Sequence, residues 1–245
     1  MLNDFDLITH AFPNEINIFP IADVHLGALE HSETDWQDFL KRVEDKNAYL
    51  ILAGDLINNS VRSAGFANPF DEVLRPREAK RRMVEYLAPL KDRILCVVTG
   101  NHERRTLRDD DQDLTYDICS KLDIEHLYRE NIAYMCVSVG IRTNRDKPVS
   151  TYNFAVTHGS GGGIYTGAAV NRNERFGNVI DGLDCFVAGH VHKGFVSKPA
   201  KIVIDGRLAY GGYAAQKMLL PTQVCDPQML HLVANKDAKK IITTW

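Results

Sequence analysis

The chain has 245 residues, of which 44% are hydrophobic, 25% charged and 9% aromatic, a composition that excludes collagen-like, low-complexity and disordered proteins. Its 29 Lys and Arg residues and 32 Asp and Glu residues give a formal charge of −3, so net charge does not favour binding to nucleic acid or an anionic membrane.

The chain contains no internal repeat and no linker rich in Pro, Gly or Ser, so we expect residues 1–245 to form a single domain. No run approaches the roughly 18 apolar residues of a membrane span. The acidic start MLNDFDLITH is not a signal peptide, which favours a cytoplasmic location without membrane attachment. The cysteines form no CxxC pair and are interpreted as free thiols; they are Cys96, Cys119, Cys136, Cys185 and Cys225.

The first half of the chain alternates short apolar runs with amphipathic stretches. Runs at 16–23 and 49–55 predict strands on either side of a helix over 35–45. A second helix is predicted over 76–90, where apolar residues recur at helical spacing, and a third strand over 94–101.

The second half is richer in strands. Strands alternating with helices predict an α/β architecture, and the strand-rich second half favours a mixed sheet or two packed sheets over a purely parallel one. The expected elements are a helix over 114–123, strands over 132–139, 151–158, 185–190 and 201–210, and a terminal hairpin over 229–234 and 240–245.

Five apolar runs end in groups that can bind metal. Because ligands of α/β sheets gather at the carboxyl ends of strands, we expect these ends to converge. One such motif alone is more often structural, but five together favour a metal site. The motifs are Asp23-Val24-His25, Gly54-Asp55, Gly100-Asn101-His102-Glu103, His158-Gly159 and Gly189-His190-Val191-His192. The remaining histidines, expected at the surface or in packing, are His10, His31, His126 and His231.

The donors in these motifs are carboxylates, an amide oxygen and imidazoles, without a thiolate. They exceed what one metal ion needs and suit two divalent ions bridged by a carboxylate, about 3.5–4 Å apart. The imidazoles favour Mn, Fe, Zn, Ni or Co over calcium, with manganese as the first choice. The candidate ligands are Asp23, His25, Asp55, Asn101, His158, His190 and His192.

In this order the motifs resemble the signature of the calcineurin-like metallophosphoesterase superfamily: DxH, GD, GNH[DE], a lone H and GHxH. The resemblance implies a two-sheet α/β/β/α sandwich with a dimetal site at the carboxyl ends of strands. It implies that Asp23, His25 and His192 bind one metal, that Asn101, His158 and His190 bind the other, and that Asp55 bridges the two.

The resemblance also implies a mechanism. A hydroxide bridging the metals would attack phosphorus in line with the leaving oxygen. His102 would contact the phosphate as general acid or transition-state stabiliser, with Glu103 as the neighbour that orients it. At least one of Arg104 and Arg105 is expected to bind a substrate phosphate, because a guanidinium can grip two phosphate oxygens.

The motifs indicate a branch of the superfamily less clearly. DVHLG at 23–27 resembles the opening of double-strand-break-repair exonucleases, whereas GNHE at 100–103 is typical of Ser/Thr phosphoprotein phosphatases. The segment GDLINNS at 54–60 lacks the arginine of the phosphatase motif GDxVDRG. We therefore expect a phosphodiesterase acting on nucleic acid or a nucleotide. The alternatives are a phosphomonoesterase or protein phosphatase and, remotely, a non-catalytic binding protein on the same fold.

Three further segments bear on substrate binding. The glycine-rich segment 159–163 is interpreted either as a mobile lid or as a plain loop, and segment 60–72 is expected to shape the pocket rim. Basic residues cluster around the 76–90 helix, where a solvated face is favoured over a polyanion-binding one; they are Arg75, Arg77, Lys80, Arg81 and Arg82.

Overall fold

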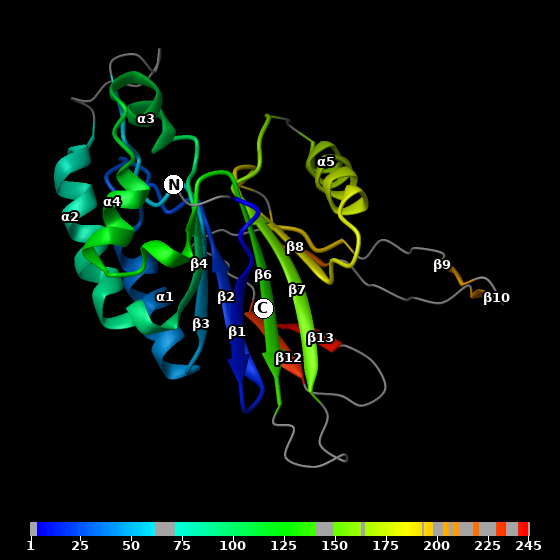
Figure 1. Ribbon diagram of the computed structural model, residues 1–245. Coiled ribbons are helices and arrows are strands. Elements are labelled where there is room, and N and C mark those ends of the chain that lie inside the picture. Colours follow the sequence, from blue (N-terminus) through cyan, green and yellow to red (C-terminus); the bar gives the residue numbers. More distant parts are fainter. Residues whose placement is uncertain are drawn as a thin grey trace.

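The computed structural model describes residues 4–61, 72–140, 149–162, 165–192 and 194–197, together with five short strands between 203 and 244. Two sheets pack face to face, and helices cover the outer face of each (Figure 1). The predicted α/β/β/α sandwich is therefore confirmed.

The first sheet has six strands in the order β13-β12-β2-β3-β4-β5. Its central strands are parallel and almost wholly buried, which explains why they are continuous apolar runs in the sequence. The antiparallel pair β12–β13 confirms the predicted terminal hairpin. The strands are β2 (Ile16–Ile21), β3 (Tyr49–Ala53), β4 (Ile94–Val98), β5 (Tyr128–Arg129), β12 (Met229–Val233) and β13 (Lys240–Thr244).

Helices cover the outer face of this sheet (Figure 1). Ser32 caps the first of them by accepting a hydrogen bond from the backbone N–H of Asp35, and the helix buries Trp36, Phe39 and Val43. The helices are α1 (Glu33–Asp45), α2 (Pro76–Leu87) and α4 (Leu114–Lys121), with 3₁₀ turns η1 (Ala88–Arg93) and η2 (Glu125–Leu127). Helix α3 (Arg104–Asp110) directly follows the GNHE motif.

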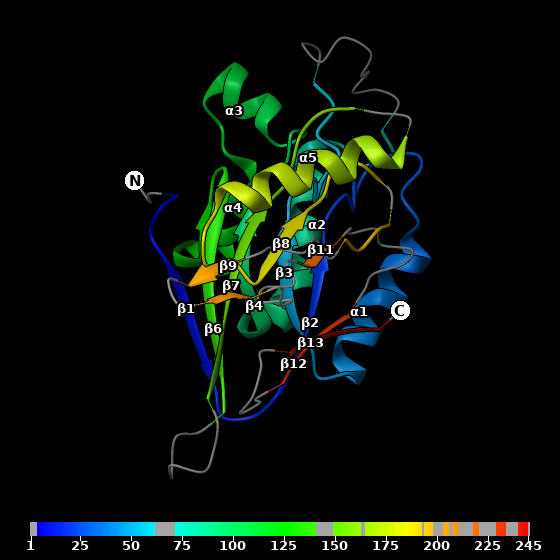
Figure 2. The same ribbon diagram turned by 90° about the vertical axis from the view of Figure 1, so that its right-hand side faces the viewer.

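The second sheet has five strands in the order β1-β6-β7-β8-β11, and α5 (Thr166–Val179) crosses its outer face (Figure 2). The ring of Phe176 on α5 stacks on Phe186 of β8, with centroids 6.0 Å apart. The strands are β1 (Ile8–Phe12), β6 (Ile132–Val139), β7 (Ser150–Thr157), β8 (Cys185–Ala188) and β11 (Met218–Leu220).

The structure corrects several sequence expectations. The single strand expected over 201–210 is two antiparallel strands, β9 (Val203–Asp205) and β10 (Leu208–Tyr210), in which Asp205 pairs with Leu208; the glycine that follows Asp205 in the sequence is the turn signal that was missed. Strand β1 and helices α3 and α5 were not predicted. Helix α5 buries one face, which is formed by Ala169, Asn173 and Gly177. Tertiary packing of this face therefore overrides the weak helix propensity of the sequence.

Free thiols are confirmed for Cys96, Cys119, Cys136 and Cys185, whereas Cys225 lies outside the described residues. Among the helices that the structure describes, none is long and apolar enough to cross a membrane.

Candidate metal centre

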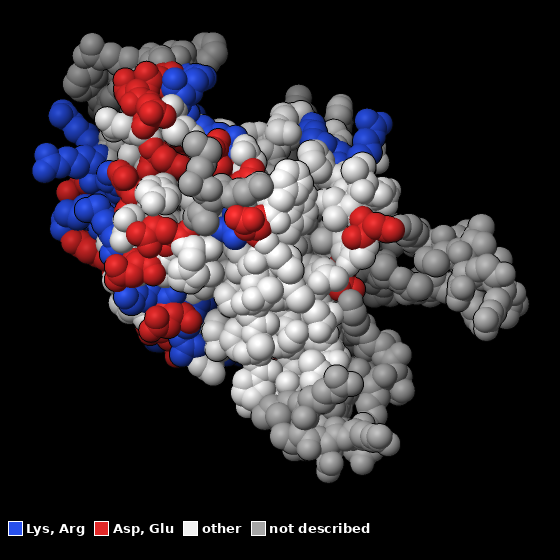
Figure 3. Space-filling view, in the orientation of Figure 1, with Lys and Arg blue, Asp and Glu red and all other residues white. Residues whose placement is uncertain are grey.

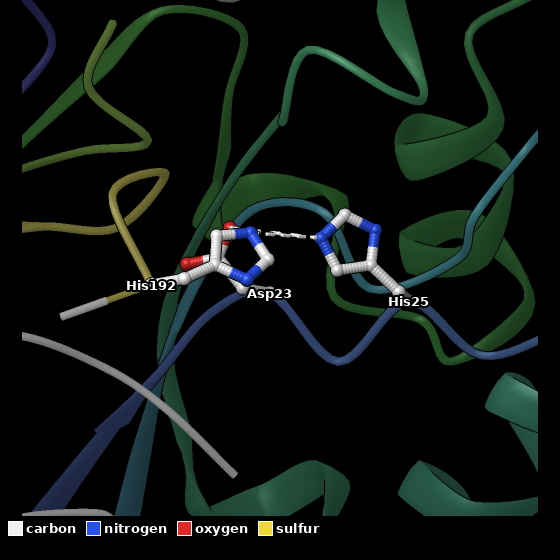
Figure 4. A group of neighbouring side chains, drawn as sticks. All are labelled: Asp23, His25 and His192. Atoms are coloured by element: carbon white, nitrogen blue, oxygen red, sulfur yellow. Dashed lines mark hydrogen bonds and ion pairs between the residues drawn. The ribbon is translucent and has the colours of Figure 1, made fainter. Parts of the chain in front are cut away.

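The five predicted motifs come together. They lie in the loops that follow β2, β3, β4, β7 and β8, and their side chains form three overlapping groups whose ligand atoms lie within 4.8 Å of one another. Figure 4 shows one group, in which Asp23 and His25 from the loop after β2 meet His192 from the loop after β8. The convergence predicted from the strand ends is therefore confirmed.

The backbone is bent sharply at these loops. Asp23, His25 and Asp55 have φ angles of 55°, 48° and 51°, and His190 and His192 have 74° and 48°. L-residues seldom adopt this left-handed conformation, and it concentrates where a site needs a side chain aimed in a particular direction. The carbonyl oxygens of Gly54 and Asp55 hold the first loop in place by accepting hydrogen bonds from the backbone N–H groups of Asp23 and His25.

Two glycines let the loops after β3 and β4 approach closely. Gly54 has a φ of 86°, and a Cβ on Gly100 would lie 2.1 Å from the backbone nitrogen of Asp55. Any side chain at Gly100 would therefore separate the two loops. Because glycine has no Cβ, both positions permit this close approach.

The first cluster is formed by Asp23, His25 and His192. The Nε2 atoms of His25 and His192 are 3.3 Å apart, and Oδ1 of Asp23 lies 3.4 Å from Nε2 of His192 and 3.9 Å from Nε2 of His25. Oδ2 of Asp23 accepts a hydrogen bond from the backbone N–H of His190. The carboxylate thus joins the loops after β2 and β8 while it directs its other oxygen at the imidazoles.

The second cluster is formed by Asp55, Asn101, His158 and His190. Oδ1 of Asn101 lies 2.8 Å from Nε2 of His158 and 2.7 Å from Nδ1 of His190. Oδ2 of Asp55 is 3.2 Å from Nε2 of His158 and 3.8 Å from Nε2 of His25, so it faces both clusters. This is the position that a bridging carboxylate requires.

One buried atom indicates that the first cluster fits a cation. Oδ1 of Asp23, which faces the imidazoles, has no hydrogen-bond partner among the described residues, although it is buried. Burial raises the pKa of Asp23 to about 6 and lowers the pKa of His25 to about 3, so without a cation the carboxylate is poorly stabilised and the imidazole stays neutral. A neutral imidazole and an unpaired carboxylate oxygen are metal ligands in need of a metal.

The second cluster holds its own charge pair. Burial alone would lower the pKa of His158, but the hydrogen bond and charge of Asp55 raise it to about 9. Nδ1 of His158 lies 2.9 Å from the carbonyl oxygen of Ala53, so Nδ1 carries the proton donated to that oxygen and Nε2 faces Asp55 and Asn101. Fixing the tautomer in this way is how proteins orient a metal-binding histidine.

His102 stands beside both clusters. Its Nδ1 lies 2.7 Å from the carbonyl oxygen of Asn58, and its Nε2 lies 3.8 Å from Oδ2 of Asp55. The backbone N–H of His102 donates to Oδ1 of Asp55. The imidazole therefore presents Nε2 to the candidate metal centre, and the Asn58 carbonyl fixes its orientation.

The structure places Glu103 differently from the expectation that it orients His102. Its carboxylate is almost wholly buried and accepts three backbone hydrogen bonds, from Asp55 and Gly100 at 3.1 Å and from Ile57 at 3.0 Å. Burial, and then the charge of Asp55, raise the pKa of Glu103 to about 7. Glu103 thus ties together the loops after β3 and β4, while Asn58 orients His102.

Replacing Glu103 with glutamine is expected to destabilise the protein, because an amide group cannot accept all three hydrogen bonds and would oppose a backbone N–H with its own. We expect the free energy of unfolding of metal-free protein to fall by about 3 kcal/mol, or the melting temperature by about 6–12 °C. Circular dichroism during heating measures this loss. The exposed Glu130→Gln variant serves as control, and a Glu103→Gln melting temperature matching that control would contradict the role.

The two candidate phosphate-binding arginines point to different places. Arg104 donates to the side-chain oxygen of Asn131 and the carbonyl oxygen of Glu130, away from the clusters. Nη2 of Arg105 lies 3.0 Å from Nε2 of His102, and its other terminal nitrogen donates to the carbonyl oxygens of Asn58 and Asn59. Of the two, Arg105 is the one beside the candidate site.

Several basic residues of α2 form ion pairs, either within the helix or with α4. Arg81 pairs with Glu78 and Glu85, and Lys80 pairs with Asp117 of α4. Positive and negative side chains accordingly alternate over this side of the molecule (Figure 3). The pattern agrees with the solvated face favoured from the sequence.

A cavity of about 520 Å³ opens beside the first cluster. Asp23, His25, His102 and His192 form one side of it. The rest is lined by Val24, which lies inside the first motif, and by residues whose place the sequence reasoning missed; these are Ala28, Glu30, His31, Ser32 and Asn58. Most of segment 60–72, expected at the rim, lies outside the described residues.

Known proteins resemble this chain to different degrees. Residues 16–194 match the sequence model of the family described as calcineurin-like phosphoesterase, whereas no curated protein matches the chain. Among solved structures, vacuolar protein sorting 29 from Cryptosporidium parvum has 11% identity and a TM-score of 0.42, over 94% of this chain and 97% of that chain. An archaeal phosphodiesterase has 15% identity and a TM-score of 0.41, over 94% of this chain and 100% of that chain. A conserved predicted phosphoesterase from Streptococcus pneumoniae TIGR4 has 11% identity and a TM-score of 0.39, over 94% and 98% of the two chains.

Proposed function

The chain belongs to the calcineurin-like phosphoesterase family, and from this premise we propose that it is a phosphodiesterase that acts on nucleic acid or a nucleotide. It would act with two divalent transition-metal ions. The single observation that carries the proposal is the position of His102, whose Nε2 lies 3.8 Å from Oδ2 of Asp55, between the two clusters, and whose side chain lines the neighbouring cavity.

We propose a separate set of ligands for each ion. Asp23, His25 and His192 would hold one, Asn101, His158 and His190 the other, and Asp55 would contact both. Two ions bound there would supply an acidified water as nucleophile and neutralise charge on the phosphoryl oxygens. Imidazole and carboxylate donors suit manganese, which is the first ion to test.

Residues of the protein would protonate the leaving group. Because Nδ1 of His102 is committed to the Asn58 carbonyl, Nε2 is the atom that can take up a proton and release it to the departing oxygen. Arg105 lies against the same nitrogen and would be the cation nearest to a bound phosphoryl group. Burial is the main reason that the pKa of His102 is lowered, with Arg105 adding to the effect and Asp55 opposing it.

Charge favours a diester over a monoester. A phosphomonoester dianion needs more positive charge around it than a diester, which carries one negative charge. The segment after β3 offers asparagines where a protein phosphatase motif has arginine, and Asn59 donates to the carbonyl oxygen of His102 instead of facing outward. Arg105 is the only guanidinium that contacts His102 among the described residues.

The experiment compares bis-p-nitrophenyl phosphate with p-nitrophenyl phosphate on metal-stripped protein reconstituted with Mn²⁺. We expect two Mn²⁺ ions per chain by elemental analysis and a higher kcat/KM for the diester. A preference for the monoester would replace the proposal with a phosphomonoesterase. Binding of two ions without hydrolysis of either ester would favour a binding protein on this fold.

A further inference from the structure

The cavity beside the first cluster is the place where the organic part of a substrate can lie. With a volume of about 520 Å³, it falls within the range of small-molecule sites. His102 and the first cluster line it, so a phosphoryl group held by the two clusters would sit at its edge. The ester group attached to that phosphoryl group would then extend over the loop 28–32.

The cavity has an apolar wall, and some of its polar side chains are already hydrogen-bonded within the protein. Val24 and Ala28 are buried and apolar, which suits the flat face of a ring. Nδ1 and Nε2 of His31 are occupied by the carbonyl oxygen of Val24 and the carboxylate of Glu33. The amide nitrogen of Asn58 is likewise engaged, because it donates to the hydroxyl of Ser60 and to the carboxylate of Glu72.

Outside the first cluster and His102, Glu30 is the charged side chain of the cavity wall that is free to meet a ligand. It lines the cavity, is exposed, and has no hydrogen bond or ion pair among the described residues. No lysine or arginine is among the described residues that line the cavity. A carboxylate accepts hydrogen bonds and repels anions, and within the roughly 8 Å over which salt screens charge at physiological ionic strength it would oppose a phosphate placed there.

Building on the proposed phosphodiesterase function, we propose that this cavity binds a single uncharged nucleoside-like group, and that Glu30 is a specificity residue that rejects a second phosphate. The ring packs on the apolar wall of Val24 and Ala28, and its N–H or O–H groups donate to Glu30. The substrate on this side is therefore a mononucleotide ester, a cyclic nucleotide or the terminal nucleoside of a strand, and the interior of a continuing strand is excluded.

The test compares two ligands that differ by one phosphate, thymidine 5′-monophosphate and thymidine 3′,5′-bisphosphate. Whichever phosphate of the bisphosphate sits at the metals, the nucleoside carries the other into the cavity. Calorimetry on the Mn²⁺-loaded full chain measures the Kd of each. We expect the monophosphate to bind about threefold to tenfold more tightly, although an additional charge would normally favour a cationic centre.

Variants at Glu30 test whether this carboxylate causes the preference. Glu30→Gln is expected to bring the ratio of the two Kd values close to one, and Glu30→Lys to invert it. The matched control is Glu44→Lys on α1, an exposed change of the same charge that lies outside the cavity. The proposal is overturned by a bisphosphate that binds wild-type protein as tightly as the monophosphate, or by a ratio that Glu44→Lys moves as far as Glu30→Lys does.

The binding test of the cavity can fail or succeed independently of the hydrolysis test of the proposed function. Binding requires no turnover, so a protein inactive on bis-p-nitrophenyl phosphate can still show the expected Kd ratio, and then only the catalytic proposal fails. If the protein hydrolyses both nucleotides as monoesters, the ratio of their KM values replaces the Kd ratio. Binding of inorganic phosphate without binding of either nucleotide would show that the cavity does not accept a nucleoside.

Discussion

The His102→Ala variant is expected to lose about 10² to 10⁴-fold in kcat/KM on a nucleotide diester while both metals stay bound. The imidazole lines the cavity and presents Nε2 to Oδ2 of Asp55, yet it belongs to neither of the two donor sets assigned above. Its removal deletes a proton donor and leaves the candidate ligands in place. The measurement pairs steady-state kinetics with elemental analysis of the same preparation.

The leaving group sharpens this prediction. p-Nitrophenolate departs without much protonation, whereas the alkoxide of a nucleoside needs a proton as it leaves. The loss in His102→Ala should therefore be smaller on bis-p-nitrophenyl phosphate than on a dinucleotide. The exposed His126→Ala variant serves as control. Equal losses on both substrates would argue against an acid role, and release of a metal from His102→Ala would show that the residue is a ligand.

The convergence of the five motifs was predictable because it depends on the sheets alone. β2, β3 and β4 are parallel neighbours, so the residues that follow them reach the same edge, and β7 and β8 bring the remaining motifs to it. A polar residue directly after a buried strand is visible in the sequence, and the direction of the strand tells where it lies. The roles given to these residues remain predictions.

Arg104 and Arg105 illustrate what sequence spacing cannot resolve. The two arginines lie two and three residues after His102, and at least one of them was expected to bind a substrate phosphate. Helix α3, which was not predicted, begins at Arg104, and neighbouring residues on a helix point about 100° apart. Arg104 consequently reaches Glu130 and Asn131 while Arg105 reaches His102.

The contacts of Glu103 and the place of Glu30 beside the cavity could not be predicted, for a related reason. Two of the three partners of Glu103 are backbone N–H groups more than 40 positions away, which no side-chain motif reveals. Glu30 lies in a loop between the first motif and the N-cap of α1, and its place in a cavity depends on how that loop folds over the first cluster. Contacts made through backbone atoms and loops are set by tertiary structure, so no local sequence pattern predicts them.

The Asp55→Asn variant is expected to have the largest effect of all, with a loss of at least about 10³-fold in kcat/KM, because it weakens both metal sites together. Oδ2 of Asp55 faces His25 of the first cluster and His158 of the second. An amide in this place offers one neutral oxygen and turns an NH₂ group toward one set of imidazoles. We expect fewer than two Mn²⁺ ions per chain, with reduced affinity for each.

Comparison with Asp23→Asn decides whether the two sites are arranged as proposed. Asp23 contacts the first cluster more closely, with Oδ1 3.4 Å from Nε2 of His192 against 4.0 Å from His158. Its variant should therefore retain one ion, while Asp55→Asn weakens both, and the exposed Asp38→Asn should bind two as wild type does. Titration of Mn²⁺ followed by calorimetry separates these outcomes. Identical stoichiometry and affinities in Asp23→Asn and Asp55→Asn would contradict a bridging role, because only a carboxylate shared by two ions couples their binding.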